Sequence, residues 1–311
     1  MTISASPNII ETRGLCKSFG ERRAVIDLDL SVPRGSAFGF LGHNGAGKTT
    51  AIRMLLGLTG ADAGAMRISG RPVPAQRAEA LARVGAIVEE PNFHRHLTGR
   101  ENLRVNAAAR GPQAKRRIDG ALHRVGLSDR ADERVRSYSQ GMRQRLGVAR
   151  CLLADPELLI LDEPMNGLDP GGILEFRTMI ANLIAEGRTV FLSSHLLDEI
   201  EKTCDAAAVI DQGRMIAQGP ISELIGGGAR ELEIGCEDPS VALDLLDGHP
   251  AVAAAVQTPD GLRISLAGAD GIASINARLV AAGVGVFRLQ AVRESLEQRF
   301  LEITSRVGGQ S

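Results

Sequence analysis

Residues 42–50, GHNGAGKTT, are of the types and at the spacing that bind phosphate groups. Glycine tolerates the positive backbone φ angles with which successive N–H groups point inward around an anion. Lys48 supplies a positive charge for β and γ phosphates, and the hydroxyl of Thr49 suits Mg²⁺. We therefore predict a nucleotide phosphate loop. Its expected residues are Gly42, His43, Asn44, Gly45, Ala46, Gly47, Lys48, Thr49 and Thr50.

Two acidic residues follow an apolar run much later in the chain. Residues 158–161, LLIL, predict a buried strand that ends at Asp162 and Glu163. We expect Asp162 to hold Mg²⁺ and Glu163 to act as general base on the water that attacks the γ-phosphate. The plainer alternative is a strand end with solvated acids. A second run, TVFLSSH, places His195 at the carboxyl edge of a neighbouring strand, where we expect it to contact the γ-phosphate.

The elements around the glycine-rich loop must hold these groups in place. Residues 36–41, SAFGFL, read as a short buried strand, and residues 49–58 carry apolar side chains at helical spacing. The order strand, loop, helix is the context that a phosphate loop requires. A glycine-rich turn that matches by chance would not have this context.

A segment before the acidic pair, YSQGMRQR over residues 138–145, identifies a family resemblance. With the motifs above it resembles the signature of the nucleotide-binding subunits of ATP-binding cassette (ABC) transporters, over about residues 8–225. The resemblance implies that Ser139 and Gly141 close over the ATP of a second subunit. A serine hydroxyl and a glycine N–H at a helix start are suited to an anion.

The resemblance assigns roles to four further positions. Phe19 matches the aromatic residue that stacks on adenine, and Val25 matches the apolar residue beside it; ordinary packing is the alternative for Phe19. Asp169 matches the acidic residue of the loop that runs between the two subunits. Glu89 stands where the family most often has a glutamine that binds Mg²⁺, although a shift of one position would transfer this role to Glu90.

The expected fold class is α/β, with a phosphate-loop NTPase core, an antiparallel β subdomain and a helical arm at about 90–150, all within residues 1–225. The glycines at 226–228 mark a boundary. Residues 226–311 are expected to form a small α+β, ferredoxin-like accessory domain in the order βαββαβ. Its predicted strands are 231–234, 252–256, 261–266 and 285–289, and its helices 240–246 and 272–282. SLEQRFLEIT, residues 295–304, is predicted as a terminal helix.

Composition excludes several classes of protein. The chain has 311 residues, 36 basic and 37 acidic, and a formal net charge of −1, which argues against nucleic acid as a partner. Its four cysteines are scattered without a CxxC pair, which indicates reduced thiols and no zinc site. Because no apolar run is long enough to span a bilayer, a membrane path must come from another polypeptide.

The sequence thus predicts the ATP-hydrolysing subunit of an ABC exporter, with ATP and Mg²⁺ as cofactors. Two such subunits, with a homodimer as the expected form, would sandwich two ATP molecules at the cytoplasmic face of the cell membrane and drive a separate membrane-spanning permease. Pro91, Asn92, Phe93 and Leu97 are the expected permease contacts, ahead of a helix capped by Thr98. Antibiotic or drug-like compounds are the expected cargo, with a lipid-linked sugar also open. The alternative is a soluble ABC ATPase acting on ribosomes or DNA.

Overall fold

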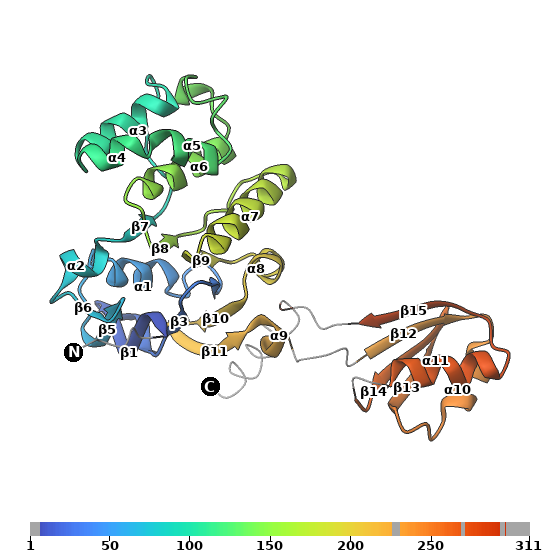
Figure 1. Cartoon of the computed structure of the whole chain (residues 1–311). Helices are drawn as coiled ribbons and strands as arrows, with labels where there is room; N and C mark the ends of the chain where they lie inside the picture. The colour runs from blue at the N-terminus through green and yellow to red at the C-terminus, as the bar shows by residue number, and fades with distance from the viewer. Residues whose placement is uncertain (1–6, 226–230, 269–270, 293–295, 297–311) are drawn as a thin grey trace. The chain divides into compact units, whose positions relative to one another are not determined.

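The computed structural model describes residues 7–225, 231–268, 271–292 and 296 (Figure 1). The chain separates into two compact units, residues 1–221 and 222–311. The division falls four residues before the expected boundary after residue 225. Within the described ranges, no helix is both long enough and apolar enough to span a bilayer.

The centre of the first unit is a six-stranded sheet in the order β11-β10-β4-β9-β8-β7. Its strands are β11 (Arg214–Pro220), β10 (Ala206–Asp211), β4 (Ala37–Leu41), β9 (Thr189–Ser194), β8 (Leu158–Leu161) and β7 (Val84–Ile87). Five of these strands run parallel to one another, and β11 pairs antiparallel with β10. Every residue of β4, β8 and β9 is buried, as expected for parallel strands covered on both faces.

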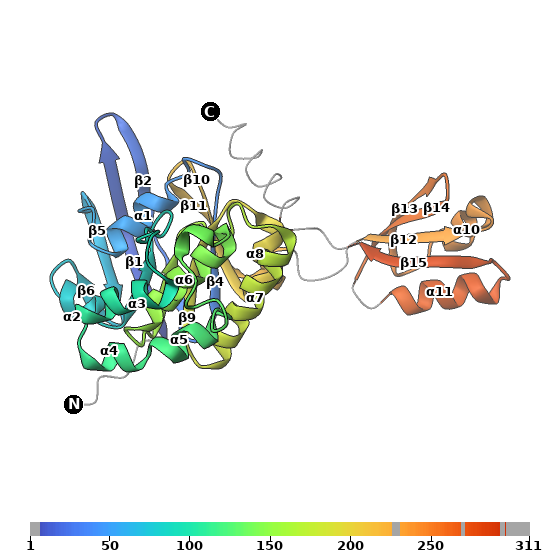
Figure 2. The ribbon, with the colours of Figure 1, turned by 90° about the horizontal axis from the view of Figure 1, so that it is seen from above.

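A second, antiparallel sheet packs on the same core. It runs in the order β2-β1-β5-β6, and β3 also pairs with β1. The strands are β1 (Asn8–Phe19), β2 (Arg22–Leu28), β3 (Ser31–Pro33), β5 (Ala63–Ile68) and β6 (Arg71–Val73). Helix α1 (Lys48–Leu55) shares a hydrophobic core with both sheets. Seen from above, β1, β2 and β5 lie on one side of this unit, and α7 (Pro170–Ala185) and α8 (Leu197–Thr203) lie on the other (Figure 2).

The helical arm forms one end of the first unit (Figure 1). It contains α3 (Gly99–Ala108), α4 (Pro112–Arg116), α5 (Ile118–Arg124), the short helix η1 (Val135–Ser137) and α6 (Gln140–Leu152). The capping box expected at Thr98 is present, because Glu101 N–H donates to the Thr98 hydroxyl and Thr98 N–H donates to the Glu101 carboxylate. Helix α2 (Arg77–Leu81) precedes the arm, and α9 (Ile221–Leu224) follows the last strand of the central sheet. The α/β core, the antiparallel sheet and the helical arm confirm the predicted fold class.

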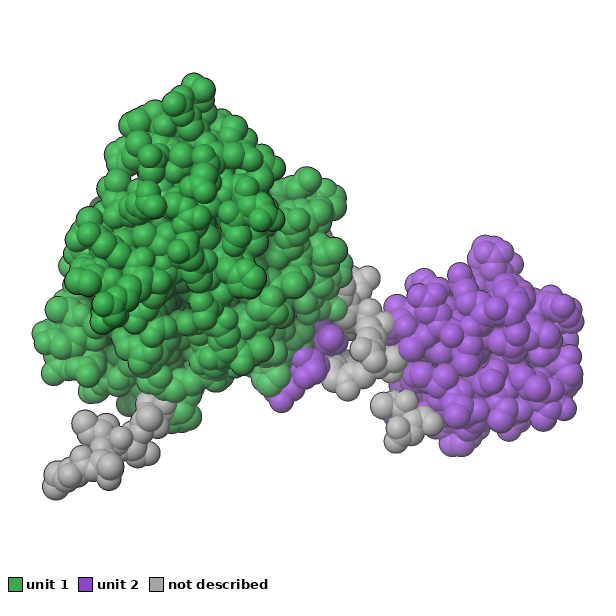
Figure 3. All heavy atoms as spheres, turned by 45° about the horizontal axis from the view of Figure 1, so that its top comes forward, with its two compact units in different colours: residues 1–221 green, residues 222–311 purple. Residues whose placement is uncertain are grey.

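The second unit, residues 222–311, is coloured purple in Figure 3. It has its own hydrophobic core. Its elements are β12 (Glu231–Cys236), α10 (Pro239–Leu246), β13 (Val252–Thr258), β14 (Gly261–Leu266), α11 (Ile272–Ala281) and β15 (Val286–Val292). They follow the order βαββαβ and form an antiparallel sheet in the order β13-β14-β12-β15. Both helices contribute to the core, with Leu246 of α10 and Leu279 of α11 fully buried beside Ile234 and Ile264. The predicted terminal helix at 295–304 lies, except for Leu296, outside the described residues.

Candidate nucleotide site

The glycine-rich loop connects the end of β4 to the start of α1. Gly45 and Gly47 have φ angles of 86° and 112°, in the left-handed region that glycine adopts without strain. A Cβ atom on Gly47 would collide with the carbonyl oxygen of Ala24, and one on Gly42 would collide with that of Ile210. The loop therefore needs glycine for two reasons: the positive φ angles at Gly45 and Gly47, and the lack of space for a Cβ atom at Gly42 and Gly47.

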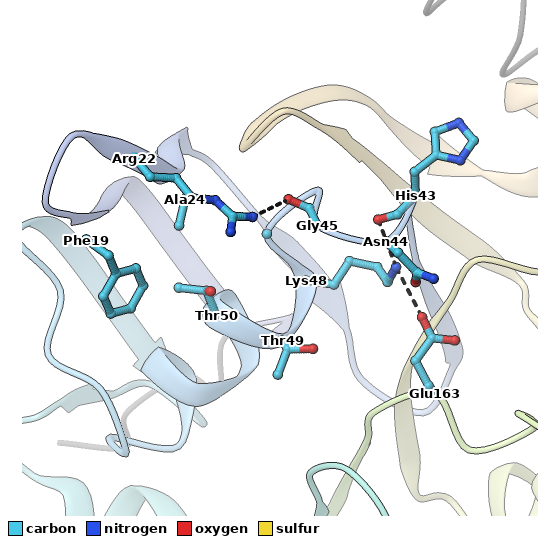
Figure 4. Close-up of a pocket in the computed structure, with 11 residues that line it drawn as sticks. Phe19, Arg22, Ala24, His43, Asn44, Gly45, Lys48, Thr49, Thr50 and Glu163 are labelled. Atoms are coloured by element: carbon cyan, nitrogen blue, oxygen red, sulfur yellow. Dashed lines mark hydrogen bonds and ion pairs between the residues drawn. The ribbon is translucent and has the colours of Figure 1, made fainter.

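A hollow of about 230 Å³ opens beside the loop (Figure 4). Its lining residues are Phe19, Arg22, Ala24, His43, Asn44, Gly45, Gly47, Lys48, Thr49, Thr50 and Glu163. Most of the predicted loop residues are among them. Gly42 and Ala46 are not, but they support the loop through their carbonyl oxygens, which accept hydrogen bonds from the Lys48 ammonium and from Gly213 N–H. The lining of the hollow thus combines the phosphate loop with Glu163, the expected general base.

Lys48 and Glu163 meet in the hollow although they come from different elements. The Lys48 side chain is 5% exposed, and its Nζ donates to Gly42 O at 2.6 Å and lies 3.1 Å from Glu163 Oε1. This second contact is an ion pair rather than a hydrogen bond. Glu163 has a φ angle of 47°, and its N–H donates to Ser193 Oγ at 2.9 Å. The backbone after β8 is thus turned so that the carboxylate faces the lysine.

His195 holds the other oxygen of the same carboxylate. Its Nδ1 lies 2.9 Å from Glu163 Oε2, and it does not itself line the hollow. The two expected catalytic side chains are therefore in contact. A carboxylate fixed between an ammonium group and an imidazole is oriented from both sides, which suits a group that must accept a proton from a positioned water molecule.

Asp162 is buried behind this pair. It is 4% exposed, and its Oδ1 accepts a hydrogen bond of 2.5 Å from Ser193 Oγ. Its carboxylate can also bind a metal ion. With the Thr49 hydroxyl, which faces the hollow, it offers the oxygen ligands that Mg²⁺ prefers. The part of the chain that is described contains no group of three or more His, Cys, Asp or Glu placed to bind a metal. A single carboxylate beside a phosphate loop fits Mg²⁺, which is usually bound through one or two carboxylates and the substrate phosphates.

Sequence reasoning overlooked Ser193. Its fully buried hydroxyl accepts from Glu163 N–H and donates to Asp162, so one side chain positions both acids. A signal was present in the sequence, because two hydroxyl residues, Ser193 and Ser194, end the predicted strand immediately before His195.

The expected adenine end of the hollow is formed by β1 and β2. The Phe19 ring is 53% exposed, and Lys17 Nζ lies 5.3 Å from its centroid. Val25 is 1% exposed and lies in the core, so it does not line the hollow, whereas its neighbour Ala24 does. Side chains alternate between the two faces of a strand, which explains the one-residue difference. Arg22, also missed, donates to Gly45 O at 3.2 Å.

Three of the predicted residues lie away from the hollow. Ser139 is the exposed N-cap of α6, and its hydroxyl accepts from Met142 N–H at 3.2 Å. Gly141 lies in the first turn of the same helix. Asp169 is the exposed N-cap of α7 and accepts from Gly172 N–H at 3.0 Å. Their roles toward a second subunit stay predictions.

Glu89 is also outside the hollow. It follows β7 with a φ angle of 64°, and its exposed carboxylate forms an ion pair with Arg53 of α1. The following residue, Glu90, is exposed as well. A role for either residue in binding Mg²⁺ stays a prediction.

Comparison with known proteins identifies relatives along nearly the whole chain. The ABC transporter family matches residues 25–166. A bacitracin transport ATP-binding protein of Bacillus licheniformis is 41% identical, and the alignment covers 97% of this chain and 98% of the relative. A Nod factor export ATP-binding protein I of Ralstonia nicotianae is 42% identical over 76% of this chain and 72% of its own length.

Solved structures give the same result for the fold. The ATP-binding subunit of an ABC transporter is 30% identical and has a TM-score of 0.61, with 70% of this chain and 91% of that chain covered. An ATP-binding cassette solved in its ADP conformation has a TM-score of 0.65 over 70% of this chain and 94% of its own; at 23% identity it supports the fold alone. Full-length similarity above 40% identity and a complete phosphate loop leave one conclusion: the chain belongs to the family of ATP-binding subunits of ABC transporters, which are ATPases.

Proposed function

We propose that the chain hydrolyses ATP with Mg²⁺ in the hollow and thereby drives export through a separate membrane-spanning subunit, at the cytoplasmic face of the membrane. The observation that carries the chemistry is the Glu163 carboxylate, held between Lys48 Nζ at 3.1 Å and His195 Nδ1 at 2.9 Å. A fixed carboxylate beside a phosphate loop is the arrangement that positions a water molecule for attack on a γ-phosphate.

The residues in and around the hollow have different roles in the proposed reaction. When the nucleotide binds, the Lys48 ammonium group pairs with the β and γ phosphates instead of with Glu163. The carboxylate is then free to accept a proton. His195 keeps that carboxylate oriented through Oε2. Asp162 and Thr49 would hold Mg²⁺, which supplies positive charge to the phosphate oxygens.

The position of the start of α6 supports a working dimer. Ser139 and Gly141 are at the start of α6, a helix of 13 residues, and neither lines the hollow of its own chain. The positive end of a helix macrodipole favours an anion. We therefore assign this helix start, together with Asp169, to the γ-phosphate side of a second copy of the chain.

In the hollow itself, the exposed ring of Phe19 is assigned to adenine, with Ala24 beside it.

The relatives favour export of an antibiotic or a drug-like compound. One relative that aligns over nearly its full length is a bacitracin transport protein, and another relative is a Nod factor export protein. A second class of activity, on ribosomes or DNA, has no support among the relatives compared. The segment that contains Pro91, Asn92, Phe93 and Leu97 is assigned to the contact with the membrane subunit.

Substitution of the proposed base tests the chemistry. Glu163→Gln keeps the shape of the side chain but removes its basicity, so we expect ATP binding to persist while turnover with Mg²⁺ falls by about 10²-fold or more. The matched control is Glu79→Gln on α2, an exposed glutamate away from the hollow, which should keep full turnover. Turnover of Glu163→Gln equal to that of the wild type would remove Glu163 from this role.

The partner is tested separately. The tagged chain is purified from detergent-solubilised membranes with Mg²⁺ and ATP present, and the copurifying proteins are identified by mass spectrometry. A polytopic membrane protein in stoichiometric amount is the expected result. Ribosomal or DNA-repair proteins without a membrane partner would contradict the transport function and leave the ATP chemistry intact.

A further inference from the structure

Two cross-strand neighbours at the tip of the first hairpin face the nucleotide hollow. Phe19, at the end of β1, lies opposite Arg22, at the start of β2. Directly opposed residues of an antiparallel pair project to the same face of the sheet, and so does a residue two positions further along the strand. Phe19 and Arg22 accordingly both line the hollow, together with Ala24. The hairpin thus places an arginine in the site beside the ring assigned to adenine.

The guanidinium group of Arg22 contacts the phosphate loop. Its Nη2 donates to Gly45 O at 3.2 Å. In Figure 4 the side chain points from β2 toward the loop and lies between Phe19 and Lys48. A guanidinium group has five N–H donors in a planar fork, so one bond to a carbonyl oxygen leaves further donors for a phosphate oxygen. The bond to Gly45 holds the group at the site before a nucleotide binds.

Arg22 gives the hollow its excess of positive charge. Of the described Arg, Lys, Asp and Glu residues, three line the hollow, namely Arg22, Lys48 and Glu163. Lys48 and Glu163 form an ion pair at 3.1 Å, so their charges balance each other. Within the described ranges, no carboxylate forms an ion pair with Arg22. Its charge is therefore available to an anionic ligand.

Lys17, another cation close to Phe19, is already paired. Its Nζ lies 5.3 Å from the centroid of the Phe19 ring, but it also forms an ion pair of 2.7 Å with Asp62. The hydrogen bond from Lys17, together with one from Ser18 N–H, holds the pKa of the Asp62 carboxyl below its usual value. The acid is therefore ionised at neutral pH and keeps its attraction for Lys17. Arg22 has no such competitor among the described residues.

The order of groups along the hollow indicates which part of the nucleotide Arg22 meets. Phe19 is assigned to adenine, and Lys48 is assigned to the β and γ phosphates. A nucleotide carries its ribose and its α-phosphate between these two ends. Because the α-phosphate is the charged group of this middle part, it is the group to which a guanidinium fork donates charge-assisted hydrogen bonds.

We propose that Arg22 binds the α-phosphate of the nucleotide, as a second cation beside Lys48. The inference rests on the proposed binding of ATP in the hollow and adds to it a binding residue on the β1–β2 hairpin. ATP and ADP share the α-phosphate, so Arg22 contributes equally to the binding of both. Lys48, which is assigned to the β and γ phosphates, contributes more to the binding of ATP than of ADP.

Substitution of Arg22 in the full chain tests this assignment. In Arg22→Ala, we expect the dissociation constants of ATP and ADP to rise by the same factor, about tenfold, as for the loss of one charge-assisted hydrogen bond. Both constants are measured by competition with a fluorescent ADP analogue. The matched control is Arg23→Ala. Arg23 is exposed, lies opposite Ser18 and does not line the hollow, so this variant should bind both nucleotides as the wild type does.

AMP and adenosine separate a contact with the phosphate from support of the loop, because they differ only in the α-phosphate. The wild type should bind AMP more tightly than adenosine, and Arg22→Ala should lose most of this difference. Arg22→Lys keeps a cation but replaces the planar fork by a point charge, so it should recover part of the difference. An unchanged circular dichroism spectrum shows that each variant folds.

Each other outcome overturns a stated part of the inference. If Arg22→Ala binds ATP and ADP as the wild type does, Arg22 does not contact the nucleotide, and the proposed function stands. If the variant loses equal affinity for AMP and adenosine, Arg22 only supports the loop through Gly45 O. A larger loss for ATP than for ADP would place Arg22 at the γ-phosphate instead. A wild-type chain that binds neither ATP nor ADP overturns the proposed function and this inference together.

Discussion

At the scale of single residues, the site depends on one carboxylate and the three groups that hold it. Glu163 contacts Lys48 and His195 through its two oxygens, and its N–H donates to Ser193. The backbone there has a positive φ angle, which costs free energy in a residue with a side chain. The surrounding contacts stabilise this conformation, so changes at the partners are expected to affect the chemistry more than the fold.

Replacement of the loop lysine tests its role in phosphate binding. Lys48→Ala removes the charge that faces the phosphates, and charge-assisted hydrogen bonds contribute about 1.5–3 kcal/mol each. We therefore expect the affinity for ATP to fall by about 10- to 100-fold in a titration with a fluorescent ATP analogue. Lys115→Ala, an exposed lysine of α4, is the control and should bind normally. Unchanged affinity in Lys48→Ala would show that the backbone alone binds the phosphates.

Replacement of Ser193 tests the residue that positions both acids. Ser193→Ala removes the donor to Asp162 and the acceptor of Glu163 N–H, and leaving a buried polar group without its partner costs about 1–3 kcal/mol. We expect the Mg²⁺ concentration for half-maximal ATPase activity to rise while ATP affinity without Mg²⁺ is retained. Ser194→Ala is the control, since its hydroxyl accepts from Leu196 N–H and contacts neither acid. A loss of stability with an unchanged Mg²⁺ requirement would make Ser193 merely structural.

At the scale of elements, parallel strands bring separate motifs to one edge. Lys48 follows β4, Asp162 and Glu163 follow β8, and His195 follows β9. Because β4, β9 and β8 are neighbours and run parallel, their carboxyl ends meet, which is where ligands bind in sheets of this type. In the arm, the Asn102 side chain instead joins two elements, because it forms hydrogen bonds from α3 to the preceding loop.

Replacement of Asn102 tests whether its side chain stabilises the loop before α3. Asn102→Ala removes three hydrogen bonds from the loop that contains His94 and Thr98, each contributing about 0.5–1.5 kcal/mol. We expect a loss of about 2 kcal/mol or more in the free energy of unfolding by urea. Asn106→Ala is the matched control, because this amide makes one hydrogen bond, to Asn102 O, and its loss should cost less than half as much. Equal effects of the two substitutions would show that the three hydrogen bonds of the Asn102 side chain do not stabilise the loop.

At the scale of the whole molecule, the chemistry belongs to one of the two units. Every residue assigned to the nucleotide lies between Phe19 and His195, within unit 1–221, and each unit has its own hydrophobic core. Independent cores are the property that allows parts of a chain to fold alone.

Truncation tests this independence. A chain that ends at residue 225 should keep its helical circular dichroism, a cooperative unfolding transition and ATP binding within about twofold of the full chain. The control is a truncation after residue 185, which removes β9 from the middle of the central sheet and should not fold. Loss of ATP binding by the chain of 225 residues would show that the second unit supports the site.

Motifs whose residues are contiguous in the chain could be predicted before the fold was known. The phosphate loop between strand and helix, the pair Asp162 and Glu163 after an apolar run, and the capping box at Thr98 follow from local backbone preferences, and the structure contains all three. Motif order also identified the family, which the relatives confirm.

Contacts between segments that are distant in the sequence could not be predicted in this way. Ser193 joins the two acids, Ala24 rather than Val25 faces the hollow, and Glu89 pairs with Arg53. Each of these depends on strand register or on the packing of elements that are distant in sequence. The physical reason is that local sequence sets which conformation a segment adopts, whereas the facing partner of each side chain is set by burial of the shared core.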